Sequence, residues 1–260
     1  MKKPIVSYII PCYNQTRWLY DAVSSAILSY TGPKEIIIIN DCSNEPGWNP
    51  RLHELQSIFP HVKIHNHQIN KGLSASRNDG LKMSKGDFIQ FLDSDDLLIP
   101  KKVDYQLKHF HTANNISISI TDYLLCDETI SSFYEDESCP GAFVFDVHDF
   151  LYKWERGLSI PIHCALFKSK SLLGESFNET LDGKEDWVFW CNLALKNSRI
   201  AYLNVIGAIY RQHQKSMTKD NICKMGENWK KATNIINDLV KDFEPNFYQE
   251  SINWYEKYYN

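Results

Sequence analysis

The first hundred residues alternate between short apolar runs and stretches with helical spacing, which predicts strands separated by helices. Strands are expected at Ile5–Ile10, Ile36–Ile39, Val62–Asn66 and Phe88–Leu92, and the last is typical of a strand buried on both faces. Apolar residues recur at helical spacing in Trp18–Tyr30, Arg51–Phe59 and Ala75–Lys82. Pro11 is expected to stop the first strand. Strands that alternate with helices over short loops predict a parallel sheet with right-handed crossovers.

The pattern changes after Pro100. Further helices are expected at Pro100–Phe110, Asp146–Trp154 and Trp187–Leu195, with a helix start near Lys168. Strands are expected at Ile116–Thr121, Ile162–Phe167, Ile200–Leu203 and Val205–Tyr210. Residues 127–140 are polar and acidic, so they are interpreted as a mobile loop.

The C-terminal tail carries two amphipathic patterns, at Met225–Val240 and Tyr248–Tyr259. We expect two helices whose apolar faces pack against the main domain. A membrane-facing aromatic surface is the alternative.

Polar residues that can bind a ligand follow four of the predicted strands. They are Pro11, Tyr13 and Asn14; Asp41; Asn70, Lys71 and Gly72 with Arg77; and Asp93, Ser94, Asp95 and Asp96. In open α/β sheets, ligands bind outside the carboxyl ends of the strands. This edge offers an aromatic ring for a base, cations for phosphate and carboxylates for a metal. The set fits a nucleotide diphosphate bound with a divalent ion.

The acidic cluster after Phe88–Leu92 is the sharpest of these signals. Asp93, Asp95 and Asp96 place three carboxylates within four residues, and their mutual repulsion calls for compensation. A hard cation such as Mg²⁺ provides it, because it takes one or two protein carboxylates and completes its shell with phosphates and water. A solvated acidic turn before the next helix is the alternative.

Composition narrows the range of partners. The 28 basic and 32 acidic residues give a net charge of −4, which argues against nucleic acid as the main partner. The seven cysteines are scattered without a Cys-x-x-Cys pair, as expected of reduced thiols in a cytoplasmic protein. We find neither a signal-peptide pattern nor an apolar run of transmembrane length, so any membrane contact is expected to be peripheral.

Six motifs occur in one order along the chain. They are Ile10-Pro11-Cys12-Tyr13-Asn14; Asn40-Asp41-Cys42-Ser43; Asn70-Lys71-Gly72 with Ala75-Ser76-Arg77-Asn78; Leu92-Asp93-Ser94-Asp95-Asp96; Glu185-Asp186-Trp187; and Tyr210-Arg211-Gln212-His213-Gln214-Lys215-Ser216. In this order they resemble the motifs of family-2 glycosyltransferases of the GT-A fold. Two positions depart from the family pattern: Asn40 stands where Asp is commoner, and Cys42 where Gly is commoner.

The resemblance implies a Rossmann-like α/β fold with a mostly parallel sheet flanked by helices, followed by a C-terminal helical extension. It implies a GT-A catalytic domain at 1–217, divided into a nucleotide-binding half at 1–97 and an acceptor-binding half at 98–217. Residues 218–260 form the expected helical extension and lie outside the resemblance.

The resemblance also implies site roles. Asp41 would hold the uracil ring, with Pro11 and Tyr13 packing beside it. The residues expected near the rest of the nucleotide are Asn14, Asn70, Lys71, Arg77 and Ser94. Asp93 would contact the ribose or the metal shell, Asp95 would bind Mn²⁺ or Mg²⁺ directly, and His213 could complete the metal or diphosphate site.

Asp186 would be the general base that takes the proton of the acceptor hydroxyl group. Such a single displacement inverts the anomeric configuration. The alternative is that Asp186 or Glu185 only places negative charge at a helix start.

The function implied is transfer of a sugar from a nucleotide-sugar donor, most simply a UDP-sugar, to a glycan or lipid-linked glycan, as in the synthesis of cell-surface polysaccharide. The expected location is the cytoplasm, with peripheral contact at the inner face of the cytoplasmic membrane as an option. A catalytically silent sugar-nucleotide-binding or scaffold protein is one alternative. A sugar nucleotidyltransferase is another, but the Pro11–Asn14 turn lacks the glycine-rich phosphate loop that this chemistry usually needs.

Other conspicuous residues favour ordinary roles. His61, His65 and His67 are interpreted as surface or satisfied histidines rather than as a metal site. For His163 and Cys164 an acceptor contact and core packing both stay open. Core packing is the default for Trp154, Trp187 and Trp190, with stacking on acceptor sugars as the alternative.

Overall fold

The computed structural model describes residues 3–113, 115–135, 140–196, 198–214 and 222–259. Within these ranges one nine-stranded sheet has the order β3-β2-β1-β4-β8-β6-β9-β5, and β7 pairs with β6. The strands are β1 (Val6–Cys12), β2 (Lys34–Asn40), β3 (Val62–Asn66), β4 (Phe88–Phe91), β5 (Leu97–Leu98), β6 (Ile118–Cys126), β7 (Phe133–Tyr134), β8 (Ala165–Lys168) and β9 (Ile200–Arg211). The helices are α1 (Leu19–Leu28), α2 (Trp48–Ile58), α3 (Leu73–Met83), α4 (Lys102–Thr112), α5 (Val147–Tyr152), α6 (Glu185–Leu195), α7 (Ile222–Val240) and α8 (Phe247–Tyr259).

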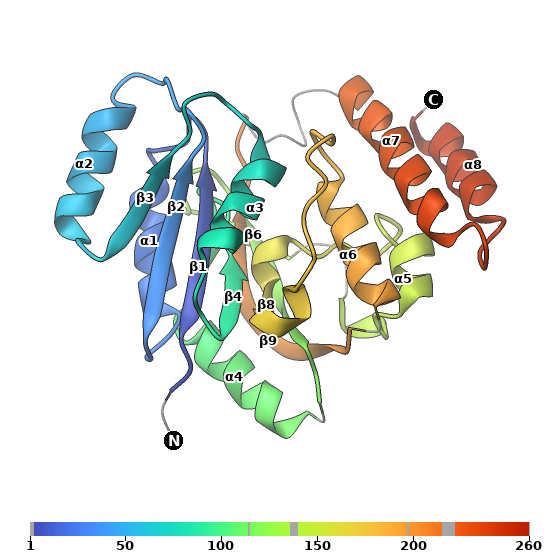
Figure 1. Ribbon diagram of the computed structural model, residues 1–260, viewed down its shortest axis with the longest axis horizontal. Helices are drawn as coiled ribbons and strands as arrows, with labels where there is room; N and C mark the ends of the chain where they lie inside the picture. The colour runs from blue at the N-terminus through green and yellow to red at the C-terminus, as the bar shows by residue number, and fades with distance from the viewer. Residues whose placement is uncertain (1–2, 114, 136–139, 197, 215–221, 260) are drawn as a thin grey trace.

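The first half of the sheet is parallel, as the sequence predicts. β1 pairs in parallel with β2 and β4, and β2 pairs in parallel with β3. Figure 1 shows α1 and α3 on opposite sides of these strands, which explains why every residue of β1 is buried. All four strand ends therefore meet at one edge.

Pro11 does not stop the first strand, contrary to expectation. It pairs with Ile39 of β2, and β1 ends one residue later at Cys12. The pairing of β1 with β4 stops earlier, at Ile9 opposite Phe91. Pro11 thus has a strand partner on one side only, where a residue without an N–H group is tolerated.

The second half of the sheet is mixed. β8 is antiparallel to both β4 and β6, whereas β9 is parallel to β6 and antiparallel to β5. The two strands expected at 200–210 are one strand, β9, because shifts of register opposite Thr121–Tyr123 let the ladder continue. The segment expected at 162–167 begins with a 3₁₀ turn, Ile162–Cys164, before β8. The expected helix start near Lys168 is another 3₁₀ turn, Ser169–Leu172.

The expected loop at 127–140 contains regular structure. β7 pairs with the end of β6, and Pro140–Ala142 forms a 3₁₀ turn. The short β7 and its polar surroundings hid this hairpin in the sequence. Residues 136–139 of this segment lie outside the described residues.

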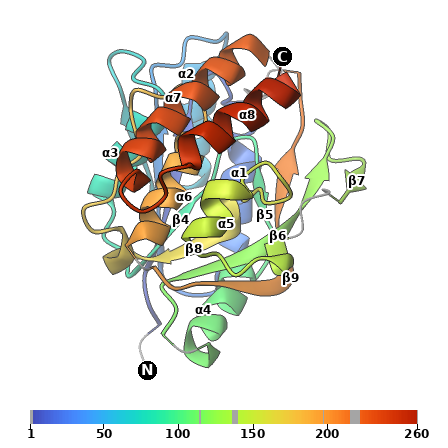
Figure 2. The ribbon, with the colours of Figure 1, turned by 90° about the vertical axis from the view of Figure 1, so that its right-hand side faces the viewer.

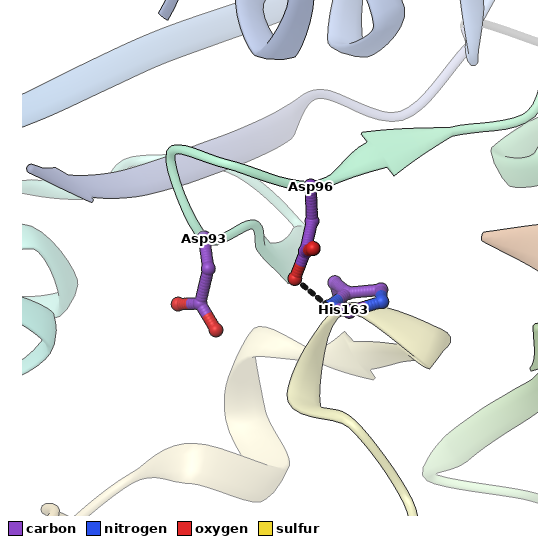
Figure 3. Close-up of side chains that lie close together, drawn as sticks. All are labelled: Asp93, Asp96 and His163. Carbon is purple, nitrogen blue, oxygen red and sulfur yellow. Dashed lines mark ion pairs between the residues drawn. The ribbon is translucent and has the colours of Figure 1, made fainter. Parts of the chain in front are cut away.

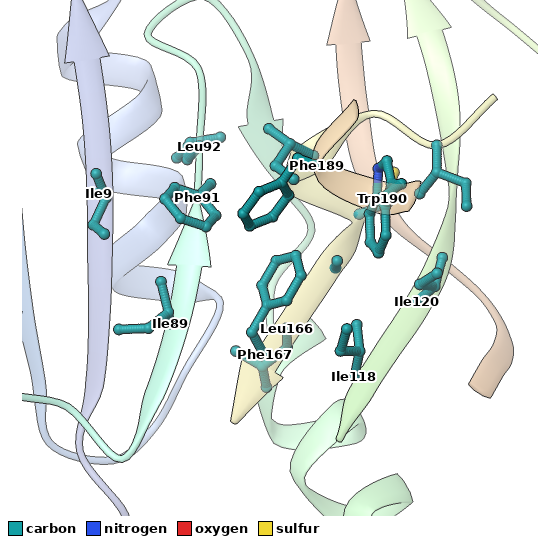
Figure 4. Close-up of a cluster of buried hydrophobic side chains, with 14 of the residues drawn as sticks. Ile9, Ile89, Phe91, Leu92, Ile118, Ile120, Leu166, Phe167, Phe189 and Trp190 are labelled. Atoms are coloured by element: carbon teal, nitrogen blue, oxygen red, sulfur yellow. The ribbon is translucent and has the colours of Figure 1, made fainter. Parts of the chain in front are cut away.

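The central core lies between the sheet and α6 (Figure 4). Phe91 of β4 meets Phe167 of β8 with ring centroids 5.7 Å apart, and Phe189 of α6 lies 6.4 Å from Phe91. Trp190 contacts Phe167 from the same helix. These rings fix the start of α6 relative to the end of β4.

The tail packs against the main domain through aromatic rings, as expected. Trp187 of α6 stacks on Trp229 of α7 at 4.3 Å, and Trp229 contacts Trp254 of α8 at 4.8 Å. Figure 2 shows α7 and α8 side by side over α6 and α5. Trp154, Trp187 and Trp190 are all buried, which confirms core packing for Trp187 and Trp190, whereas Trp154 also lines a cavity. In the described part of the chain, no helix combines the length and apolar character needed to cross a membrane.

Candidate active site

A cavity of about 440 Å³ opens at the carboxyl ends of β1, β2 and β4. Seven of the nucleotide and metal residues expected from the sequence line it: Pro11, Tyr13, Asp41, Asn70, Asp93, Ser94 and Asp95. Asp96, Glu185 and Tyr210 also lie in its wall. The parallel strands bring these residues together, because their carboxyl ends share one edge.

Asp41 is held by a cage of donors. The backbone N–H of Lys71 donates to Asp41 Oδ1 and that of Gly72 donates to Asp41 Oδ2, each at 2.8 Å. His67 Nδ1 lies 2.7 Å from Asp41 Oδ1. Gly72 has φ of 89°, a value that favours glycine, and this conformation precedes the start of α3. The Asn-Lys-Gly motif thus supplies backbone donors to the carboxylate.

The side chain of Lys71 turns away from Asp41, and its Nζ lies 3.1 Å from Asp79 Oδ2. Lys71 does not line the cavity in this structure.

Asn14 joins the loops that follow β1 and β2 and does not line the cavity. Its Oδ1 accepts hydrogen bonds from the backbone N–H groups of Asn44 and Glu45, at 2.8 and 3.1 Å. Asn14 and Cys42 have φ of 54° and 60°, in the left-handed region. The departure from glycine at position 42 therefore falls where glycine is favoured.

Asp95 contacts two side chains through one carboxylate oxygen. Gln15 Nε2 donates to Asp95 Oδ2 at 2.8 Å, and His213 Nε2 lies 2.9 Å from the same oxygen. Ser94 Oγ donates to Gln15 Oε1 at 2.6 Å. The structure thus brings His213, which follows β9, next to the acidic turn. His213 itself is buried and does not line the cavity.

Asp96 lies beneath this turn and is fully buried. Its Oδ1 accepts a hydrogen bond from the Arg211 backbone at 2.8 Å, and His163 Nδ1 lies 3.0 Å from its Oδ2. Burial raises the pKa of Asp96 above its ordinary value, while His163 acts in the opposite direction. Figure 3 shows Asp93 across the turn from this pair, and the three residues offer ligand atoms within 4.8 Å of one another. Asp93, Asp96 and His163 thus form a candidate metal cluster.

His163 and Cys164 are core residues, with 0% and 1% of their surface exposed. Of the two interpretations left open by the sequence, the structure agrees with core packing.

Arg77 is buried and does not line this first cavity, but it lines a second one. Its Nη2 donates to both oxygens of Asp93 at 2.8 and 3.0 Å, and its Nη1 donates to Glu185 Oε1 at 2.8 Å. Burial opposes its charge, but Asp93 and Glu185 raise the pKa of the guanidinium above its ordinary value. Arg77 therefore links the acidic turn after β4 to the first residue of α6.

A second cavity, of about 310 Å³, adjoins the first. Leu73, Asp93, Glu185 and Tyr210 line both cavities. Asp186 lines the second cavity together with Trp154, Lys184 and Met225, the last from α7. The acidic turn and the start of α6 thus form the boundary between two neighbouring spaces.

Asp186 is half-buried in the first turn of α6. Burial, followed by the charge of Glu185, raises the pKa of Asp186 to about 7, although Lys184 and Arg77 act to lower it. A carboxylate with such a pKa can both hold and release a proton near neutral pH.

The family model for glycosyl transferase family 2 matches residues 7–171, more than half of the chain. The chain belongs to this family. Helices flank the sheet as in the GT-A fold, which the solved neighbours share.

Two relatives illustrate the range of family 2. An uncharacterized glycosyltransferase from Rickettsia felis is 32% identical over 201 residues, which cover 74% of this chain and 31% of that protein. The chain thus spans about a third of the length of that first relative. The Escherichia coli UDP-Glc:alpha-D-GlcNAc-diphosphoundecaprenol beta-1,3-glucosyltransferase WfgD is 26% identical, with 92% of this chain and 87% of that protein covered.

Two solved structures share the fold at low identity. Staphylococcus aureus TarS 1–349 in complex with UDP-GlcNAc superposes with a TM-score of 0.69 at 17% identity, covering 99% of this chain and 73% of that one. The mannosyltransferase PcManGT from Pyrobaculum calidifontis, in complex with GDP-Man and Mn²⁺, gives a TM-score of 0.65 at 14% identity, covering 100% and 70%.

Sequence reasoning missed several residues of this family-2 site. Gln15 directly follows the Pro-Cys-Tyr-Asn motif, so its position beside that motif was the available signal. Tyr210 stands in the sequence only as part of the Tyr-Arg-x-His motif, yet it lines both cavities. His67 was interpreted as a surface or satisfied histidine. It is buried, and no pattern in the sequence indicates that its partner is Asp41.

Proposed function

We propose that the protein transfers a sugar from a UDP-sugar to a hydroxyl group of a glycan or lipid-linked glycan, with inversion at the anomeric carbon. The observation that carries this proposal is the pair of adjoining cavities that meet at Asp93 and Glu185, with Asp186 lining the second. A donor in the first cavity and an acceptor in the second would meet close to Asp186, which lines the second cavity. Direct displacement requires both substrates beside one base.

In this proposal the nucleotide occupies the first cavity. Asp41 accepts a hydrogen bond from the base, and Pro11 and the half-exposed Tyr13 pack against the ring. Asn70 and Asp93 face the sugar and phosphate portion. The name of the WfgD relative, which specifies UDP-Glc, supports the choice of nucleotide.

The residues beside the first cavity fit a hard divalent cation. Asp93 and Asp95 supply carboxylate oxygens, and His213 supplies a ring nitrogen next to Asp95. We propose Asp95 as the direct ligand, with Asp93 and His213 completing the site. Bound Mn²⁺ or Mg²⁺ would stabilise the negative charge on the departing diphosphate. The presence of Mn²⁺ in the PcManGT neighbour supports this assignment.

Asp186 takes the proton of the acceptor hydroxyl group in this proposal. Its raised pKa matches a base that works near neutral pH. Trp154 and the apolar side chains around the second cavity give an acceptor sugar a surface on which to lie. Met225 adds a wall from α7, so the helical tail takes part in shaping the acceptor space.

A lipid-linked acceptor would bring the protein to a membrane surface by peripheral contact, and a cytoplasmic location fits the use of a nucleotide sugar. The name of WfgD, with its GlcNAc-diphosphoundecaprenol acceptor, supports a lipid-linked sugar. The oligomeric state plays no part in the proposal.

The proposal is tested by incubating the protein with UDP-glucose, UDP-GlcNAc or UDP-galactose, a GlcNAc-diphospholipid acceptor, and either Mn²⁺ or EDTA. We expect acceptor-dependent release of UDP from one donor, a product of inverted configuration, and loss of turnover in EDTA. Binding of UDP without transfer from any donor would favour the silent binding protein. Release of pyrophosphate from UTP and a sugar phosphate would favour the nucleotidyltransferase.

A further inference from the structure

His67 lies behind the base-reading carboxylate and has no role so far. It follows β3 directly, and 1% of its side chain is exposed. Its ring is placed between two carboxylates: Nδ1 lies 2.7 Å from Asp41 Oδ1 and Nε2 lies 3.2 Å from Asp79 Oδ2. His67 does not line the nucleotide cavity, so its effect on a ligand must pass through Asp41.

The hydrogen bonds of Asp41 are almost fully assigned. A carboxylate offers about four acceptor positions on its two oxygens. Among the described residues, Lys71 N–H and His67 Nδ1 reach Oδ1, and Gly72 N–H reaches Oδ2. Because the backbone amides can only donate, they hold Asp41 as an acceptor, and His67 Nδ1 is then the donor. One acceptor position, on Oδ2, is left for the cavity.

On the far side of the ring, Nε2 lies near Asp79 but makes no hydrogen bond among the described residues. Asp79 of α3 accepts hydrogen bonds from Lys82 Nζ at 2.9 Å and Lys71 Nζ at 3.1 Å. Partial burial works against its charge, but the hydrogen bonds and charges of Lys82 and Lys71 lower the pKa of Asp79 to about 2. Asp79 therefore stays ionised, and its carboxylate lies beside the ring that donates to Asp41.

We propose that His67 is a positioning residue that orients Asp41 as an acceptor-only reader of the base and so favours uracil over cytosine. Uracil presents an N–H donor at N3, in the middle of its pairing edge, where cytosine presents an acceptor. An acceptor held in one orientation pairs with the first and repels the second. Cytosine offers only its exocyclic amine, which is displaced along this edge. Without His67, the two backbone donors alone would hold Asp41 less firmly, and its carboxylate could turn toward that amine. The inference rests on the proposed nucleotide site and deepens it.

The experiment measures the dissociation constants of UDP and CDP by calorimetry, with Mn²⁺ present, for the wild type and two variants. His67→Leu removes the donor to Asp41, and His67→Asn keeps an N–H group near the position of Nδ1. A lost hydrogen bond to a charged group corresponds to about a tenfold change in affinity. We expect His67→Leu to weaken UDP binding by about tenfold and CDP binding much less, so that the preference for UDP shrinks. His67→Asn should restore most of that preference.

The matched control is His61→Asn, because His61 is exposed just before β3 begins. It should leave both affinities unchanged. Thermal unfolding of each variant separates loss of fold from loss of base recognition, and His67→Asn tests the inference even if His67→Leu does not fold. Equal UDP preference in the wild type and both folded variants would overturn the inference and leave the proposed function intact. Failure of the wild type to bind any nucleotide would instead remove the proposed function itself.

Discussion

Arg77 Nη1 donates a 2.8 Å hydrogen bond to Glu185 Oε1, and this bond joins two motifs that lie 108 residues apart in the chain. Arg77 belongs to α3, whereas Glu185 opens α6 and precedes the proposed base. The other end of the guanidinium holds Asp93 of the acidic turn. One buried cation thus sets the spacing between the carboxylates that face the two cavities.

Replacing Arg77 by Met should therefore destabilise the protein strongly. The change leaves Asp93 and the buried Glu185 without their shared counter-charge, and breaking such a buried pair costs about 3–5 kcal/mol. Urea unfolding measures the loss. Arg199→Met is the matched control, because Arg199 is exposed and its removal should change stability by less than about 0.5 kcal/mol. Similar losses in both variants would show that the Arg77 network contributes little.

Asp186→Asn should abolish turnover while donor binding survives. Asparagine keeps the size of the side chain but cannot take a proton, and general-base catalysis typically contributes about 10²–10⁴-fold to the rate. The test compares kcat with the dissociation constant for UDP. Asp238→Asn, on an exposed part of α7, serves as the control that should change neither quantity. A variant that lost UDP binding with its fold intact would place Asp186 in the donor site instead.

The pH profile should report the same carboxylate. Burial and the Glu185 charge raise the pKa of Asp186 to about 7, so the base is protonated below that value and active above it. The rate should fall by about tenfold per pH unit on the acid side, with the limb near pH 7 instead of near the ordinary aspartate value of about 4. Initial rates across pH 5–9 test this. Full activity at pH 5 would be incompatible with Asp186 as a base of raised pKa.

The raised pKa of Asp186 should also make folding stability fall as the pH rises, whereas activity rises. Between about pH 4 and 7 the unfolded chain has released the Asp186 proton that the folded chain still holds, so raising the pH through this window lowers stability. Asparagine cannot ionise, so the Asp186→Asn variant does not lose this stability. The free energy of unfolding of the variant minus that of the wild type should therefore be larger at pH 8 than at pH 5. Urea unfolding at the two pH values measures the difference. An identical difference at both would mean that Asp186 titrates alike in the folded and unfolded chains.

Asp95→Asn should weaken the part of UDP binding that depends on a divalent cation. Asparagine keeps an oxygen near Gln15 and His213 but loses the charge that a hard cation prefers. We expect Mn²⁺ to raise the UDP affinity of the wild type. The ratio of affinities with and without Mn²⁺ should be at least about tenfold smaller in the variant. UDP affinity without Mn²⁺ is the internal control and should be unchanged. Equal enhancement in both proteins would assign the metal to other ligands.

The sequence predicted the parallel strands β1 to β4 and the edge where they end, because the signal for each strand lies in its own short segment. The apolar runs of β1 to β4 and the polar residues after them follow from period and strand polarity alone. Contacts between segments that are far apart in the sequence leave no comparable pattern in either segment. The placement of Arg77 beneath Asp93, and of His67 against Asp41, depends on how α3 and β3 pack, which no short pattern encodes.

The second half was harder to predict for a related reason. β7 is two residues long, and β9 continues past a change of register that splits its apolar pattern. A short strand gives too few positions to show a period, and a bulge interrupts the period that exists. His163 illustrates the consequence, because its burial against Asp96 depends on the antiparallel β8, which the parallel pattern of the first half did not anticipate.

Replacing Cys42 by glycine, the commoner family residue, should stabilise the protein. Its φ of 60° lies in the left-handed region, which is unfavourable by about 1–2 kcal/mol for a residue with a Cβ atom. Cys42→Gly relieves that strain, but glycine adds about 0.5–1 kcal/mol of conformational entropy to the unfolded chain. The weak contact of Cys42 Sγ with the Gln68 carbonyl oxygen, at 3.6 Å, is also lost. We expect Cys42→Gly to raise the free energy of unfolding in urea by about 0.5–1 kcal/mol net.

Ser43→Gly is the control, because Ser43 is the next residue and has no positive φ. This variant should lose stability, because the Ser43 Oγ accepts a hydrogen bond from the Asn14 backbone at 3.0 Å. A loss for both variants would mean that the Cys42 side chain stabilises the loop by more than its backbone strain costs.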